Sequence, residues 1–318
     1  MTLLEARAMG MCFGVRDALA LARERASQGR VTMLGDLVHN PEVVADLQAR
    51  GVQSVRDPGR IASGEILVTA HGVSDRRRAD LERTGLPVVD ATCPLVRRAH
   101  AALHDLVARG CHPVVIGQRQ HVEVLGLTED YPEADVVLSE EEVAQLAPRG
   151  RYGVVAQTTQ PVGRVRQLVE ALRRRFPAAE VILRDTVCQP TKDRQGAALE
   201  LARAVDVVVV VGGPQSNNTR ELSDACRRQC DRVHQVASAG ELCREWFRPD
   251  DRVGLTAGTS TPEWTLDAIR AWLGALAREW ADRASGEGGR PPRKAAAVGE
   301  PAGKSRWEGA LATVPVPG

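Results

Sequence analysis

The sequence has few aromatic residues, almost no net charge and no long hydrophobic run. Aromatic residues make up 3% of the 318 positions, which leaves few rings on which nucleic-acid bases could stack. The 42 Lys and Arg residues nearly cancel the 41 Asp and Glu residues, so no overall field attracts nucleic acid or an anionic membrane. No window reaches the roughly 18 uninterrupted apolar residues that a membrane span needs. We expect a soluble protein with no nucleic-acid partner and no membrane partner.

Signals for secretion and for an internal electron carrier are also lacking. The first thirty residues contain acids and arginines without an apolar signal core, so we expect a cytoplasmic protein. Seven cysteines is an odd number, which argues against a full disulfide framework and favours thiol or metal chemistry. No G-x-G-x-x-G turn or flavin signature is present, so electrons for a redox reaction must come from another molecule.

Three of the cysteines each open a segment with the same order of signals. An amphipathic helical pattern follows Cys12, Cys93 and Cys188, so each is predicted to lie near a helix N-terminus. A β-rich run then ends in a glycine that lies 23, 24 and 24 residues beyond its cysteine, at Gly35, Gly117 and Gly212. This regular spacing predicts one structural unit that is present three times.

Polar side chains follow two predicted strands in each unit. The turns after the first strand carry His39, His121 and Ser216, each four residues beyond the glycine, and the turns after the second carry His71, Thr158 and Ser260. Strands that alternate with helices predict parallel sheets, in which ligand sites gather at the carboxyl ends of the strands. We therefore expect an α/β fold of three similar domains about a pseudo-three-fold axis, with the three cysteines converging on it.

This interpretation divides the chain into three domains and a tail. The first spans residues 13–93, the second 94–187 and the third 188–281, with residues 1–12 joining the third. From about Ser285 the sequence becomes rich in Gly, Pro and Ala and loses its apolar period. Such a segment cannot offset its ordering entropy, so residues 282–318 are expected to form a disordered tail.

The repeated positions predict a metal centre beside an anion site. Thiolates bind soft metals and iron-sulfur clusters, and a helix N-terminus favours the thiolate. A free cysteine is otherwise usually a small buried hydrophobe, but three matched positions favour function. The polar turns, together with Asn218, are rich in donors and poor in acids, which suits a phosphate or diphosphate. Glu123, two residues after His121, can enter the same pocket and act as an acid if it is desolvated.

Two further groups are weaker candidates for a metal site. Cys226 and Cys230 lie four apart on a predicted helix, and His100 and His104 share a helix face. Neither pair has evident additional ligands of the kind that a zinc site requires. A surface pair is the favoured interpretation of the two histidines, and Cys111 and Cys243 fall at no repeated position.

Eight short motifs, in order along the chain, resemble those of the 4-hydroxy-3-methylbut-2-enyl diphosphate reductase family, also called the LytB family. The resemblance covers essentially residues 1–280 and includes all three cysteines. The motifs are G-x-C-x-G-V at 10–15, L-V-H-N at 37–40, A-H-G-V-S at 70–74, D-A-T-C-P-L-V at 90–96, H-x-E-V at 121–124, Q-T-T at 157–159, S-x-N at 216–218 and T-A-G-x-S-x-P at 256–262.

The resemblance implies a trefoil-like body of three α/β domains around a central 4Fe-4S cluster. It implies an iron-sulfur oxidoreductase that converts 4-hydroxy-3-methylbut-2-enyl diphosphate into isopentenyl and dimethylallyl diphosphates, the last step of the non-mevalonate isoprenoid pathway. Ferredoxin or flavodoxin would be the electron donor. By matching position, Glu123 would deliver protons, Thr158 would position the substrate hydroxyl, and the cluster would be held by Cys12, Cys93 and Cys188. The diphosphate would be bound by His39, His71, His121, Ser216, Asn217, Asn218 and Ser260.

Several residues depart from the pattern of the family, namely Val122, Leu125, Gln189, Pro190, Lys192, Asp193 and Asn217. They flank the implied ligands, so a divergent paralogue that acts on a related substrate remains an alternative. A second alternative is a non-catalytic cluster sensor, against which the intact Glu123 and Thr158 argue. A third is a cluster protein similar to quinolinate synthase or diphthamide synthase, which the histidine turns disfavour.

Overall fold

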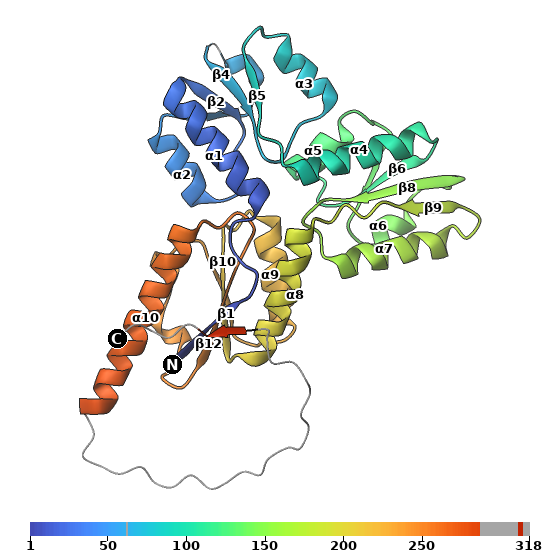
Figure 1. Cartoon of the computed structure of the whole chain (residues 1–318). Coiled ribbons are helices and arrows are strands. Elements are labelled where there is room, and N and C mark those ends of the chain that lie inside the picture. Colours follow the sequence, from blue (N-terminus) through green and yellow to red (C-terminus); the bar gives the residue numbers. More distant parts are fainter. Residues whose placement is uncertain (62, 287–310, 314–318) are drawn as a thin grey trace.

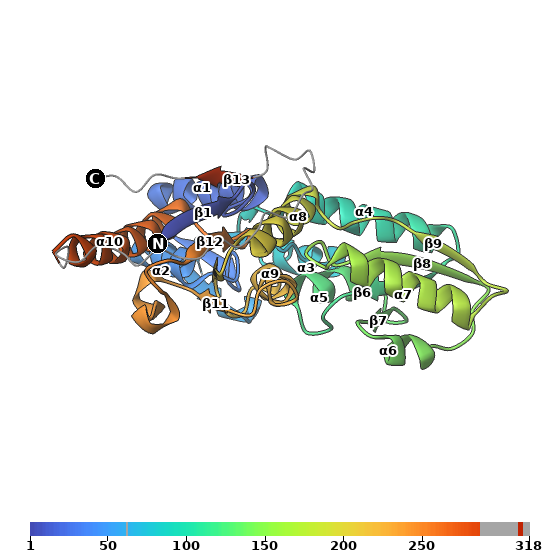
Figure 2. The ribbon, with the colours of Figure 1, turned by 90° about the horizontal axis from the view of Figure 1, so that it is seen from below.

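The described residues form three separate sheets, each flanked by helices (Figure 1). The structure is a computed structural model and describes residues 1–61, 63–286 and 311–313. In Figure 1 the three sheets and their helices form three lobes that meet near the middle of the molecule. Figure 2, seen from below, shows the second lobe extending away from the other two.

The first lobe has a four-stranded parallel sheet in the order β3-β2-β4-β5. Its strands are β2 (Val31–Leu34), β3 (Gln53–Val55), β4 (Glu65–Val68) and β5 (Val88–Asp90). Its helices are α1 (Phe13–Gln28), α2 (Pro41–Ala49), the short 3-10 helix η1 (Pro58–Arg60) and α3 (Asp75–Glu82). Buried side chains from α1, α2 and the strands form one apolar cluster.

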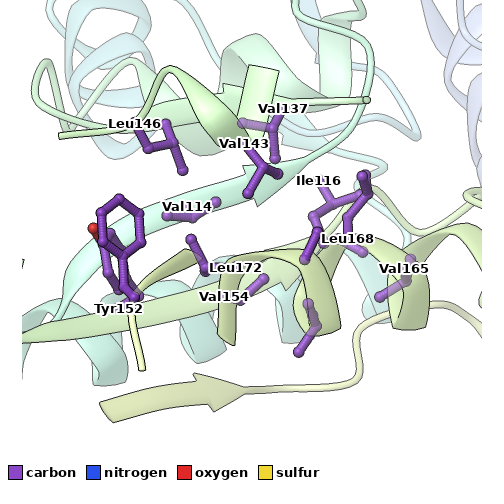
Figure 3. Packing of buried hydrophobic residues seen from close by; sticks show 14 of the residues in the cluster. Val114, Ile116, Val137, Val143, Leu146, Tyr152, Val154, Val165, Leu168 and Leu172 are labelled. Atoms are coloured by element: carbon purple, nitrogen blue, oxygen red, sulfur yellow. The ribbon is translucent and has the colours of Figure 1, made fainter. Parts of the chain in front are cut away.

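The second lobe repeats this plan in the order β7-β6-β8-β9, again all parallel. Its strands are β6 (His112–Ile116), β7 (Asp135–Val137), β8 (Arg151–Ala156) and β9 (Glu180–Leu183). Its helices are α4 (Pro94–Ala108), α5 (Val122–Thr128), α6 (Glu140–Ala144) and α7 (Val162–Arg175). Figure 3 shows how Leu168 and Leu172 of α7 pack against Val114 and Val154 of the sheet.

The third lobe contains both the C-terminal part of the chain and its first strand. Its sheet has the order β11-β10-β12-β1-β13, and only the β1–β13 pair is antiparallel. The strands are β1 (Thr2–Ala6), β10 (Val207–Val211), β11 (Val233–Val236), β12 (Arg252–Ala257) and β13 (Leu311–Thr313). The helices are α8 (Gln189–Ala204), α9 (Asn217–Arg227), the 3-10 helices η2 (Ala239–Glu241) and η3 (Arg244–Trp246), and α10 (Glu263–Gly286).

The strand orders explain why the cysteines converge. In the third sheet β1 occupies the position that β5 and β9 occupy in the other two. Each of these strands leads through a turn with a cysteine into the first helix of another lobe: β1 into α1, β5 into α4 and β9 into α8. The chain therefore crosses between lobes at Cys12, Cys93 and Cys188. The three-domain α/β architecture is confirmed, and we propose the boundaries 13–93, 94–187 and 188–281, with residues 1–12 assigned to the third domain.

The expected tail is wrong at two places that the structure describes. Helix α10 continues to Gly286, so residues 282–286 are helical, because the apolar spacing of Trp272, Leu276 and Trp280 carries on into helix-tolerant residues. Residues Leu311–Thr313 form β13 beside β1. The remainder of the expected tail, 287–310 and 314–318, lies outside the described residues. Among helices of the described part, none has the length and apolar character to cross a membrane.

Candidate active site

Six helix N-termini surround the junction of the three lobes. Cys12, Cys93 and Cys188 are the N-cap residues of α1, α4 and α8, and the three thiols make no capping hydrogen bond. The N-cap residues of α2, α5 and α9 are Asn40, His121 and Ser216, whose side chains each accept a hydrogen bond from a first-turn N–H group. Because helix N-termini carry partial positive charge, this junction favours a bound anion.

One cavity between the lobes brings together every residue that the sequence singled out for the site. Its volume is about 90 Å³, whereas roughly 10–15 Å³ is enough for one water molecule, so a small ligand can enter. The residues predicted for the site all belong to its lining, namely Cys12, His39, His71, Cys93, His121, Glu123, Thr158, Cys188, Ser216, Asn217, Asn218 and Ser260. Each of the three domains contributes side chains from the carboxyl ends of two strands.

The three thiols lie close to one another without forming disulfides. Burial raises the pKa of Cys188 to about 11 and also raises the pKa of Cys93, and in both cases the charge of Cys12 adds to the effect. Three adjacent thiolates need a cation to balance them, which a metal centre supplies. At Gly14 an added Cβ would collide with Sγ of Cys93, so the glycine leaves room beside this thiol.

The three histidines form a compact cluster on another wall of the cavity. The ring centroids of His39 and His71 are 4.6 Å apart and stacked, and His121 meets them edge-on at 5.0 and 5.5 Å. Burial lowers the pKa of His121 to about 3 and lowers the pKa of His39 and His71 as well. The three rings are therefore neutral at pH 7 in the free protein.

This cluster has the composition of a metal site, since ring nitrogens of the three histidines lie within 4.8 Å of one another. The hydrogen bond of His121 argues for an anion instead. Nδ1 of His121 accepts the backbone N–H of Glu123 at 3.1 Å, so in the neutral ring the proton is on Nε2. An Nε2–H group donates to an anion and has no lone pair for a metal.

Glu123 is buried in the first turn of α5, with 2% of its surface exposed. Its carboxyl oxygens accept the backbone N–H of Thr158 at 2.6 Å and the Thr158 hydroxyl at 3.0 Å. Burial raises the pKa of Glu123 to about 7, against the opposing effect of these two bonds. The carboxyl group also lies near enough to Cys93 and Cys188 to influence their pKa values. Such a group can hold and release a proton near neutral pH.

Several buried polar atoms in the cavity have no hydrogen-bond partner within the described part of the chain. Asn218 Oδ1 accepts from the backbone of Thr259, which leaves its Nδ2 unpartnered. Asn217 donates to Thr159. Buried polar groups without partners are costly, so these atoms indicate a site for a polar ligand. They are Nδ1 of His39 and His71, Oδ1 of Asn217, Nδ2 of Asn218 and Oγ of Ser260.

The weaker candidates do not form a second metal site. Cys226 and Cys230 are buried in the apolar cluster beneath α8, and their thiols face backbone carbonyls. Helix α9 ends at Arg227, so the expectation that Cys230 lies on the same helix is wrong. Cys111 is buried and Cys243 is exposed. His100 and His104 line a separate polar cleft between α3, α4 and α5.

Some residues near the cavity escaped the sequence analysis. Thr159 lines the cavity, and its hydroxyl accepts a hydrogen bond from Asn217. An aspartate stands three residues before Cys93 and Cys188, which a direct alignment of the three segments would have revealed. Among the departures from the family pattern, Pro190 and Asn217 line the cavity, whereas Val122 and Leu125 are exposed.

Comparison with known proteins gives a consistent set of matches. The sequence model of the LytB protein family matches residues 3–274. The 4-hydroxy-3-methylbut-2-enyl diphosphate reductase of Geobacter metallireducens is 39% identical over 273 residues, which cover 85% of this chain and 95% of the relative. The protein of the same name from Pelobacter propionicus is 38% identical over 279 residues, with coverages of 87% and 99%.

Solved structures show the same likeness. A structure of (E)-4-hydroxy-3-methyl-but-2-enyl diphosphate reductase, described as the terminal enzyme of the non-mevalonate pathway, superposes with a TM-score of 0.64 at 33% identity. It covers 86% of this chain and 100% of that chain. The E-1-hydroxy-2-methyl-but-2-enyl-4-diphosphate reductase of Plasmodium falciparum superposes with a TM-score of 0.78 at 25% identity, with coverages of 84% and 86%.

Proposed function

The chain belongs to the LytB protein family, and from this premise we propose that it reduces 4-hydroxy-3-methylbut-2-enyl diphosphate to isopentenyl and dimethylallyl diphosphates. This reaction, the last step of the non-mevalonate pathway, consumes two electrons and two protons and releases water. The observation that carries the proposal is that three thiols, a histidine cluster and a buried carboxyl group line the same cavity. The reaction needs a redox centre, an anion site and an acid.

The redox centre is one 4Fe-4S cluster held by Cys12, Cys93 and Cys188. The fit rests on three thiols that line one cavity at three helix N-termini and form no disulfide. When bound, such a cluster supplies single electrons and, because only three cysteines hold it, one iron without a protein ligand that can act as a Lewis acid.

The diphosphate is bound by the polar wall of the cavity. His121 donates from Nε2, because its Nδ1 is already engaged by the N–H group of Glu123. His39 and His71 have unpartnered ring nitrogens that can take up protons from solution when the anion binds. Their partners on the third domain are Ser216, Asn217, Asn218 and Ser260, three of which also present unpartnered buried atoms.

Glu123 and Thr158 act on the hydroxyl group that leaves. The carboxyl group of Glu123 is protonated in part of the molecules near pH 7 and can give this proton to the hydroxyl, which then departs as water. The Thr158 hydroxyl, 3.0 Å from the same carboxyl group, orients the substrate hydroxyl toward it.

The two electrons come from a separate protein, for which ferredoxin or flavodoxin is the proposed class. Aromatic residues are few, and the motifs that would hold a flavin or nicotinamide are missing from the sequence. An external one-electron donor also suits a cluster, which accepts one electron at a time.

The proposal is tested by anaerobic reconstitution with iron and sulfide, followed by the oxidation of reduced viologen on addition of 4-hydroxy-3-methylbut-2-enyl diphosphate. We expect oxidation that depends on this diphosphate and yields both products. The variant Glu123→Gln should lose most of this turnover. Its matched control is Glu170→Gln, which changes an exposed carboxylate on α7 that pairs with Arg173 and should retain full turnover. Cluster-bearing wild-type protein that never oxidises viologen would contradict the proposal.

A further inference from the structure

The turns that carry Cys93 and Cys188 are fastened in the same way. An aspartate three residues before the cysteine accepts the N–H of the residue just before it: Asp90 from Thr92 at 2.9 Å, and Asp185 from Val187 at 3.2 Å. A basic residue four positions after the cysteine then pairs with this aspartate. Arg97 lies 3.1 Å from Asp90, and Lys192 lies 2.6 Å from Asp185. We call each such pair of an aspartate and a basic residue a clasp.

The turn of Cys12 has no clasp. Met9 stands where the aspartate would be, although Arg16 follows the cysteine at the same spacing. In its place the side chain of Arg194, from the second turn of α8, reaches across to this turn. Its Nε donates to the carbonyl oxygen of Gly10 at 2.9 Å, and an Nη donates to that of Met9 at 3.5 Å.

Arg194 also holds the turn of its own helix. A second Nη of Arg194 donates to the carbonyl oxygen of Pro190 at 3.0 Å. Gly10 lies two residues before Cys12, and Pro190 lies two residues after Cys188. The guanidinium group therefore connects the turn of Cys12, which leads into the first domain, with the turn of Cys188, which leads into the third.

The charge of Arg194 has no carboxylate partner in the described part of the chain. The side chain is buried, with 9% exposed, and its three hydrogen-bond acceptors are backbone carbonyls. The neighbouring Asp193 accepts from Gln189 instead. Burial lowers the pKa of Arg194, and the anionic groups that raise it most are Cys12 and Cys188. A buried charge is costly unless it is balanced, and thiolates at these cysteines would balance it.

We propose that Arg194 is a positioning residue that fastens the Cys12 turn to α8 and supplies the positive charge that balances the Cys12 and Cys188 thiolates of a bound cluster. This inference rests on the proposed function insofar as it takes the three cysteines as cluster ligands. Arg194 differs from the two clasps in its charge. A clasp is an ion pair with no net charge, whereas Arg194 adds one positive charge to the site.

A positive charge near a cluster favours its reduced state, because reduction adds negative charge. Removing the charge of Arg194 should therefore shift the midpoint reduction potential to more negative values. Removing a clasp without a change in net charge should not produce this shift. The two effects, fastening and charge, can thus be separated by the choice of variants.

The experiment compares reconstituted wild type with Arg194→Met, Arg194→Lys and the double variant Asp185→Asn/Lys192→Met. Iron and sulfide content after reconstitution reports the fastening, and a spectroscopic redox titration with dithionite and mediator dyes reports the charge. We expect Arg194→Met to load less cluster and to have a more negative midpoint potential. Arg194→Lys should keep the potential near that of wild type, and so should the double variant, although its turn is loosened.

Three outcomes would overturn the inference. The first is equal loading and equal potential in Arg194→Met and wild type. The second is the same shift in Arg194→Lys as in Arg194→Met, since the charge is then not the cause. The third is the same shift in the double variant, since loosening of a turn then suffices. If Arg194→Met does not fold, Arg194→Gln takes its place in every comparison, because its amide can still donate to a backbone carbonyl but carries no charge. Wild type that binds no iron contradicts the proposed function itself, whereas loaded wild type without turnover leaves this comparison intact.

Discussion

Thr158 donates two hydrogen bonds to the carboxyl group of Glu123, one from its backbone N–H at 2.6 Å and one from its hydroxyl at 3.0 Å. The two residues come from turns 35 positions apart at the ends of neighbouring strands. The bonds fix the position of a carboxyl group whose burial raises its pKa to about 7. The cavity therefore contains a titratable carboxyl group in a defined orientation near Cys93 and Cys188.

Glu123→Gln should lower kcat by roughly 10²–10⁴-fold, the range typical of a lost general acid. Substrate binding should change little, because the proposed diphosphate site lies on the histidine wall and the third domain. Anaerobic steady-state kinetics and a binding titration with the substrate check the two parts separately. A Glu123→Gln variant with near wild-type kcat would show that the proton comes from another group.

The raised pKa of Glu123 also predicts a pH dependence of stability in the metal-free protein. The carboxyl group has a pKa near 4.5 when unfolded and about 7 when folded, so between these values the folded state binds a proton that the unfolded chain has released. Its contribution to the unfolding free energy is therefore full below pH 4.5 and is lost as pH rises through 7. The loss is on the order of 3 kcal/mol for a fully buried group.

Urea unfolding of metal-free wild type and Glu123→Gln at several pH values between 5 and 8 measures this difference. Glutamine does not titrate, so the variant should gain stability relative to wild type as pH rises across this window. Parallel curves for the two proteins would show that Glu123 titrates normally in the fold.

His121→Asn should weaken the binding of inorganic diphosphate while preserving the fold. Asparagine is also a favoured N-cap and can replace Nδ1 as the acceptor of the α5 N–H group, but it cannot place a donor where Nε2 lies. The lost bond to a charged ligand is expected to cost roughly 1.5–3 kcal/mol, that is, at least a tenfold rise in Kd. His104→Asn, on the exposed face of α4, is the matched control, and equal affinity in the two variants would exclude His121 from the anion site.

Binding of diphosphate should take up protons. Burial keeps the pKa of all three histidines below the usual 6.5 in the free protein, and a nearby anion raises it. Affinity should therefore increase as pH falls from 8 to 6. Calorimetric titrations in two buffers of different ionisation enthalpy count the protons directly, and a binding heat that is independent of the buffer would contradict the proposed role.

Gly14→Ala should reduce cluster loading, since the new Cβ would collide with Sγ of Cys93. Gly196→Ala is a close control, because Gly196 is also a helical glycine and a Cβ there meets no neighbouring atom within 4 Å. It should load normally and gain about 0.5–1 kcal/mol from the better helix propensity of alanine. Iron analysis and thermal unfolding of both variants test this, and normal loading of Gly14→Ala would show that the thiol can move aside.

Much of this arrangement was predictable from local patterns. The apolar periods placed Cys12, Cys93 and Cys188 at the starts of helices. Because ligand sites gather at the carboxyl ends of parallel strands, His71, Thr158 and the other polar turns were expected at that end of each sheet. Local patterns do not contain the contacts between domains, so the convergence of the three cysteines was an inference until the strand orders were seen.

The features that the sequence analysis missed have specific causes. The position of Arg194 depends on β1 joining the third sheet, which brings Met9 and Gly10 beside α8. The N-cap role of His121 was missed because α5 has only seven residues, too few for a clear helical period, and histidine is not among the usual N-cap residues. Helix α10 extends past the expected boundary at residue 281. The change in composition shows where the apolar pattern ends, but it does not show at which residue the helical backbone ends.

The most direct test of the account is a ⁵⁷Fe Mössbauer measurement on reconstituted protein, before and after the addition of 4-hydroxy-3-methylbut-2-enyl diphosphate. We propose that the substrate binds in the same cavity as the cluster, with the diphosphate on the histidine wall and the hydroxyl group toward the cysteines. We therefore expect the substrate to change the signal of one iron and to leave that of the other three, and we expect Cys188→Ser to lower the iron content. A spectrum unchanged by saturating substrate would contradict the central claim that thiols, histidines and Glu123 form one active site.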